Sequence, residues 1–166
     1  MSSRIDRSAR KAAQKAKGKK KKINKGKREV TNLMVREYNL EQIGYDFMGY
    51  EIKKDSSISF HHMVVSHSRC IREGIPQEGY LKWNGAILVQ DPSHDYLHII
   101  QRTDIDLFHR ITDELVAIND KGWVDPENVK KIHGYLEQFE EEHKEDTNKS
   151  GHPLIKEHYI TNRHAF

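Results

Sequence analysis

Five residues of this 166-residue chain have types and spacings that could support metal chemistry: the doublet His61-His62, then Asn84, then His94 and His98. Three imidazoles can hold one divalent ion and leave its other positions open to water or a phosphate oxygen, as a catalytic site requires. A fourth imidazole, with an unperturbed pKa of about 6.5, suits a general base at neutral pH. An amide can orient that base through its second nitrogen. Together these groups are the parts of a metal-dependent phosphodiesterase.

The spacing of the last two histidines suggests how they could share an ion. Residues four apart on a helix lie on one face, with Cβ atoms about 5–6 Å apart. His94 and His98 can therefore point at one ion, and the doublet is the obvious source of a third ligand. Strict alternation along a strand would aim His61 and His62 at opposite faces. Both can serve one site only where the strand ends or twists at the doublet.

Two strands and a loop are predicted around these residues. The β-forming side chains within residues 57–66 predict one strand, and the run GAILVQ over 85–90 predicts a second. The segment between them, residues 66–83, contains two glycines and a proline. It predicts a loop with a helical turn near residues 68–73.

The pair Asp91-Pro92 predicts the start of the helix that carries the two spaced histidines. Aspartate can accept backbone N–H bonds at an N-cap, and proline is tolerated at the first helical position. We expect this helix to run to about residue 102. Apolar residues at roughly helical spacing predict a supporting helix within residues 30–45.

Further helical support is predicted within residues 104–144. Apolar side chains recur there at spacings of three and four, which is typical of helices packed on a core. Gly122 is expected to end the first of these helices, and Asp125-Pro126 to start the second.

Charge is distributed unevenly along the chain. Thirteen of the 28 Lys and Arg residues and one of the 25 acidic residues lie in residues 1–28, so 15 basic and 24 acidic residues remain in 29–166. The net charge of +3 therefore combines a basic tail with an acidic body. The composition predicts that residues 1–28 are disordered in isolation. The tail is either a solvated segment or an arm that grips nucleic-acid phosphates.

The single cysteine, Cys70, excludes an internal disulfide framework and a multi-cysteine zinc knuckle. It fits a reducing compartment, and we expect a cytoplasmic protein. No apolar run reaches the roughly 18–20 residues that a bilayer span needs, so no membrane partner is expected.

The histidine–asparagine pattern resembles the HNH endonuclease family, and in motif order its colicin-type DNase branch. By motif position, His61 looks like the first metal ligand, and His94 and His98 like the others. His62 looks like the general base, and Asn84 like the residue that orients it. The resemblance covers about residues 57–100.

The resemblance implies an α+β fold with a small ββα-metal core, a hairpin and one helix around a divalent ion. This core would span about residues 57–102 and be embedded in the additional helices of a single domain over residues 29–166. The chain departs from the family in the long step from His62 to Asn84 and in lacking a Gly-Gly turn after the doublet. Because the cysteine pairs of many members are also absent, the helices must brace the hairpin.

The leading hypothesis is a metal-dependent endonuclease that hydrolyses phosphodiester bonds in DNA. Three imidazoles suit Zn or Ni, whereas phosphodiesterases often use Mg or Mn, so the sequence does not predict the identity of the ion. One alternative is a non-catalytic nucleic-acid-binding protein that uses its basic tail and has a structural or vestigial metal site. Another is a small interaction protein whose acidic body binds a basic partner. The oligomeric state is not predicted.

Overall fold

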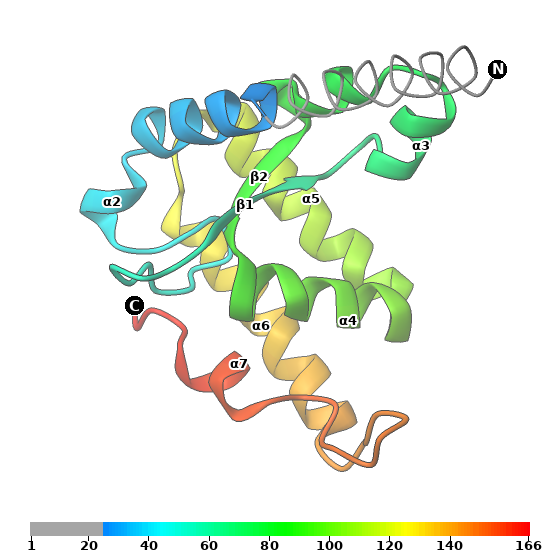
Figure 1. Cartoon of the computed structure of the whole chain (residues 1–166). Coiled ribbons are helices and arrows are strands. Elements are labelled where there is room, and N and C mark those ends of the chain that lie inside the picture. The colour runs from blue at the N-terminus through cyan, green and yellow to red at the C-terminus, as the bar shows by residue number, and fades with distance from the viewer. Residues whose placement is uncertain (1–24) are drawn as a thin grey trace, which may run out of the picture.

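A two-stranded antiparallel hairpin lies at the centre of the fold in the computed structural model, which describes residues 25–166 (Figure 1). Strand β1 (Ile58–His62) pairs with β2 (Gly85–Val89), and His61 lies opposite Ala86. Because β1 ends at His62, the condition for both histidines of the doublet to serve one site is met. Helices and this small sheet give the predicted α+β class.

Helices surround the hairpin in the described residues. One helix spans residues 25–37. The other helical elements are α2 (Leu40–Ile43), α3 (His67–Arg72), η1 (Pro76–Tyr80), η2 (Lys82–Asn84), η3 (Gln90–His94), α4 (Asp95–Thr103), α5 (Ile105–Lys121), α6 (Pro126–His143) and α7 (Glu157–Thr161).

The prediction that residues 1–28 are disordered is wrong for residues 25–28. Residues 1–24 lie outside the described residues, but residues 25–28 are helical, as part of the helix over residues 25–37. That helix is anchored on the core by Thr31 and Met34, and Tyr38, just after it, is buried as well. This packing stabilises the helix as a whole, residues 25–28 included.

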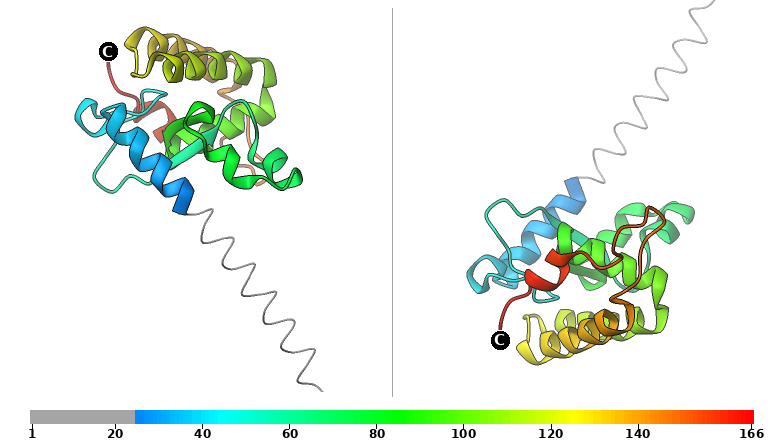
Figure 2. Two further views of the ribbon diagram at one scale, coloured as in Figure 1. Left: turned by 90° about the horizontal axis from the view of Figure 1, so that it is seen from above. Right: turned by 90° about the horizontal axis from the view of Figure 1, so that it is seen from below.

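Helices α5 and α6 confirm the helical support predicted over residues 104–144. Gly122 follows α5 in the left-handed region with φ 77°, which glycine adopts without steric cost. Asp125 caps α6, because its side chain accepts a hydrogen bond from the backbone N–H of Glu127. Figures 1 and 2 show this helix pair on one side of the hairpin and helix 25–37 on the other.

The start of the histidine-bearing helix differs from the prediction. Asp91 has an extended backbone but makes no capping hydrogen bond. Its carboxylate instead contacts His158 Nε2 of α7 at 2.6 Å. A π-helical turn, η3, precedes α4, and this turn contains His94. The predicted helix over 92–102 is therefore real, but the capping role of Asp91 is wrong because a non-local partner takes its carboxylate.

The long step between the strands folds into helical turns rather than an open loop. It contains α3, which confirms the turn predicted near residues 68–73, followed by η1 and η2. Ser66 caps α3 by accepting from the backbone N–H of Arg69. This segment packs beside β1 and forms one wall of the site described below. Within residues 25–166, no helix combines the length and apolar character of a bilayer span.

Candidate metal centre

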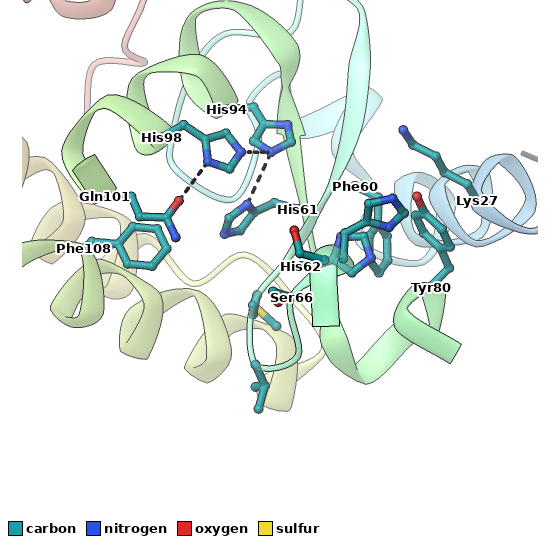
Figure 3. Close-up of a pocket in the computed structure, with 14 residues that line it drawn as sticks. Lys27, Phe60, His61, His62, Ser66, Tyr80, His94, His98, Gln101 and Phe108 are labelled. Carbon is teal, nitrogen blue, oxygen red and sulfur yellow. Dashed lines mark hydrogen bonds between the residues drawn. The ribbon is translucent and has the colours of Figure 1, made fainter. Parts of the chain in front are cut away.

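Three of the predicted residues converge: His61 from β1, His94 from η3 and His98 from α4 (Figure 3). His98 Nε2 lies 2.9 Å from His94 Nε2, and His61 Nδ1 lies 3.4 Å from the same atom. The three ligand atoms all lie within 4.8 Å of one another. An ion at about 2.0–2.1 Å from two imidazole nitrogens holds them about 2.9–3.4 Å apart for ligand angles of about 90–110°.

Hydrogen bonds favour one tautomer of the two helical imidazoles. The hydroxyl of Ser59 lies 3.0 Å from the carbonyl of Leu88 and 2.7 Å from His94 Nδ1, so it accepts from His94 Nδ1 when it donates to that carbonyl. His98 Nδ1 lies 3.0 Å from Gln101 Oε1, which is an acceptor. In this arrangement each ring carries its proton on Nδ1 and a lone pair on Nε2. Such outer hydrogen bonds orient metal-bound histidines in proteins.

With both protons on Nδ1, the two Nε2 lone pairs face each other at 2.9 Å. Two acceptors at that distance repel each other, whereas a cation between them turns the repulsion into attraction. In addition, His61 Nε2 is buried without a hydrogen-bond partner, so the hydrogen bonds of this ring are incomplete. These features fit a divalent ion with three imidazole ligands.

Burial keeps the imidazoles of His61 and His94 in the form that a metal requires. His61 is only 4% exposed, and this burial, with His94 and His98 nearby, holds its pKa well below the usual value. Burial and the neighbouring His98 lower the pKa of His94 to about 4. Neutral rings at neutral pH have lone pairs free for coordination.

The ion would keep open positions. Among residues 25–166, no fourth histidine, cysteine or carboxylate joins the three ligands. The cluster opens into a cleft of about 540 Å³ that His62 also lines. The ring of His61 packs against the ring of Phe108 in α5, which also lines the cleft, and the two ring centroids lie 6.2 Å apart. An open position beside a cleft is typical of catalytic rather than structural sites.

His62 lies on the same side of β1 as Phe60 and packs against Tyr80 and His67, with ring centroids 4.8 and 5.3 Å away. Its Nε2 is buried without a partner beside Gly79, where an added Cβ would lie 2.9 Å from that nitrogen. Nδ1 is therefore the nitrogen left for a bound ligand. Burial, followed by the charges of His67 and Lys27, lowers the pKa of His62 to about 4.

The predicted hydrogen bond between Asn84 and His62 is wrong. Asn84 is fully buried, and its oxygen accepts from the backbone N–H groups of Val64 and Val65 at 2.9 Å. Its nitrogen donates to the carbonyls of Val65 and Gly79. The side chain of Asn84 therefore makes its four hydrogen bonds to backbone groups of the segment between the two strands. Asn84 thus acts on His62 only indirectly, through the position of Gly79.

Four residues of the site were not predicted from the sequence: Ser59, Gln101, Gly79 and Lys27. Ser59 shares a strand face with His61, two residues on, and Gln101 follows His98 by one helical turn, so spacing alone could have suggested both. Tertiary packing places Gly79 against His62 and Lys27 at the cleft. Nothing local in the sequence marks those two positions.

The charge of the cleft contrasts with that of the body. In the part of the chain that the structure describes, no aspartate or glutamate lines it, although acidic residues outnumber basic ones in residues 29–166. Four other clefts of the described surface each contain at least one carboxylate, as at Glu41, Asp55, Glu73 and Asp91. The histidine cleft is therefore the one among these five whose lining would not repel a phosphate.

Comparisons with known proteins add no relative to this description. A scan against protein-family models, a search of curated proteins and a search of solved structures each found no match to this chain.

Proposed function

We propose that this protein is a metal-dependent nuclease of the HNH type, which hydrolyses phosphodiester bonds in DNA. The observation that carries the proposal is the convergence of the ligand atoms of His61, His94 and His98 within 4.8 Å of one another, beside a cleft that no aspartate or glutamate of residues 25–166 lines.

The residues of the chain have separate roles in the proposed reaction. When bound, a divalent ion supplies the positive charge that stabilises the pentavalent phosphate and its leaving oxygen. His62, neutral at pH 7, accepts a proton from the attacking water at Nδ1. Gly79 fixes the ring from behind, and Asn84 holds Gly79 in place. Both are positioning residues.

The ligand set favours one group of ions. Imidazole nitrogens suit Zn and Ni, whereas Mg and Mn prefer oxygen ligands, and no carboxylate lines the cleft. We therefore propose that Zn or Ni is the more tightly bound ion and that Mg and Mn activate more weakly. DNA as the partner and a cytoplasmic location both belong to the proposal.

A plasmid-nicking assay tests the proposal. The full chain, stripped of metal and reloaded with Zn²⁺, Ni²⁺, Mg²⁺ or Mn²⁺, should convert supercoiled DNA to the nicked form. EDTA and His62→Ala should each abolish nicking, while His152→Ala, an exposed histidine remote from the cluster, should not. Nicking that survives both EDTA and His62→Ala would overturn the proposal.

The non-catalytic alternative is favoured by one observation. A base whose pKa is about 4 accepts protons weakly, and the buried Nε2 of His62 has no acceptor to stabilise the charged ring. In that case the cluster would hold a structural ion and the basic tail would bind the nucleic acid. DNA binding by the metal-loaded protein with no nicking under any ion would support this candidate.

A further inference from the structure

Among residues 25–166, Lys27 is the one lysine or arginine that lines the histidine cleft. It belongs to helix 25–37, far from β1 and α4 in the sequence. Figure 3 shows it at one end of the cleft, with Gln101 and Phe108 at the other end and His62 between them. A phosphate that reaches the histidine cluster therefore enters a cleft with a single lysine at its far end.

The helical register explains why this lysine lies on the cleft side of its helix. Thr31 and Met34 follow Lys27 by four and seven residues and are both buried, so Lys27 lies on the same helix face one turn earlier, where it is exposed and lines the cleft. The hydroxyl of Thr31 donates to the carbonyl of Lys27 at 2.7 Å, which fixes this part of the helix. The core ends at this turn, and the side chain of Lys27 extends into the cleft instead.

No carboxylate of the same helix neutralises Lys27. Within the described part of the helix, the positions three and four residues after Lys27 are Val30 and Thr31. The two glutamates of the helix pair elsewhere, Glu29 with Lys25 at 3.8 Å and Glu37 with Lys82. Within residues 25–166, no ion pair involves Lys27. Its charge is thus available to an anionic ligand.

We infer that Lys27 binds a backbone phosphate of the nucleic-acid substrate, on the side of His62 away from the histidine cluster. This inference rests on the proposed function, because it takes the cleft as the substrate site. A lysine ammonium is a compact charge that binds phosphate without strict geometric demands. The contact positions the strand so that its scissile bond lies over His62.

A binding experiment without turnover tests the inference. The probe is a fluorescein-labelled trinucleotide of thymidine, short enough to fill the cleft, and its anisotropy is followed with the full chain in EDTA. Lys27→Ala should weaken binding about tenfold and reduce the salt slope by about 0.7. Lys27→Arg, which keeps the charge, should restore most of the affinity.

Lys25→Ala is the matched control, because Lys25 lies on the same helix but pairs with Glu29. It should change trinucleotide affinity less than twofold. Equal losses in the two alanine variants, an unchanged affinity in Lys27→Ala, or no binding by the unaltered protein would each overturn the inference. Binding through Lys27 by a protein that fails to nick plasmid would leave the inference standing and remove only the nuclease proposal.

Discussion

The imidazoles of His94 and His98 owe their orientation to neutral oxygen acceptors. Ser59 Oγ and Gln101 Oε1 take the Nδ1 protons, so both Nε2 lone pairs point to one place. His61 has no such partner for Nε2 and is held by burial and by the contact with Phe108 instead. At the residue scale, hydrogen bonds therefore orient two of the three ligands, His94 and His98, whereas His61 would be held in place partly by the bound ion.

Removal of the acceptor on Ser59 should loosen the centre. In Ser59→Ala, His94 loses its Nδ1 partner and can rotate or change tautomer, so we expect Zn²⁺ affinity to fall about 10–100-fold. A competition titration against a chromophoric chelator measures the affinity. Ser68→Ala, an exposed serine of the same cleft, is the control and should leave it unchanged.

His62 should depend on the absence of a side chain at position 79. In Gly79→Ala the new Cβ would lie 2.9 Å from both His62 Nε2 and Cys70 Sγ, so the ring must move. We expect nicking to fall about 10–100-fold, because a shift of about 1 Å in a reacting group has such an effect. Zn²⁺ affinity should not change.

Gly134→Ala serves as the control for that experiment, because a Cβ at Gly134 meets nothing within 4 Å. Full nicking activity in Gly79→Ala would show that the position of His62 against Gly79 has no bearing on the reaction.

At the scale of elements, the hairpin is held together by Asn84. Its side chain ties the end of β1 to the turn η1 through four backbone hydrogen bonds, which closes the long connection between the strands. The connection is therefore closed by side-chain hydrogen bonds rather than by a short turn. This closure also explains why a connection with two glycines and a proline folds into compact helical turns.

Loss of these hydrogen bonds should mainly lower the stability of the fold, with nicking affected only as a consequence. Asn84→Ala leaves buried backbone groups without partners, and we expect the free energy of unfolding to fall by about 2–4 kcal/mol. Urea denaturation followed by circular dichroism measures it, with the exposed Asn32→Ala as control. An unchanged midpoint together with lost nicking would instead return Asn84 to the orienting role predicted from the sequence.

Local signals in the sequence were enough for some elements and not for others. Helix α6 was predicted with its cap because Asp125, Pro126 and the apolar period all lie within one segment. The hydrogen bonds of Asn84 and the pairing of Asp91 with His158 join residues far apart in the chain. The convergence of three histidines followed from motif order, but the position of Lys27 depends on how helix 25–37 packs.

At the scale of the whole molecule, the C-terminal segment returns to brace the core. Arg163 forms a paired contact with Glu140 of α6 at 2.6 and 2.7 Å, and both side chains are about 12% exposed. Tyr50 pairs with Arg163 through an isolated β-bridge, and its hydroxyl donates to the carbonyl of Tyr159. No local pattern in residues 154–166 predicts this bracing, because the partners of Arg163 lie far from it in the sequence.

This buried ion pair should be costly to break from one side. Arg163→Ala leaves Glu140 with only the hydroxyl of Tyr96, and we expect unfolding free energy to fall by about 3–5 kcal/mol. Thermal and urea denaturation measure the loss, with the exposed Arg36→Ala as control. The double variant Arg163→Leu, Glu140→Leu should recover part of it, since no unpaired charge remains. Equal stability of the single variant and the unaltered protein would contradict this bracing role.

The measurement that tests the central claim most directly is a Co²⁺ titration of the metal-free full chain, followed by visible absorption. Three imidazoles and water should give one bound ion per chain, displaced by Zn²⁺. His61→Ala, His94→Ala and His98→Ala should each abolish the bound-ion spectrum, while His152→Ala retains it. An absent spectrum in the unaltered protein, or an unchanged one in His94→Ala, would contradict a metal centre at these three histidines.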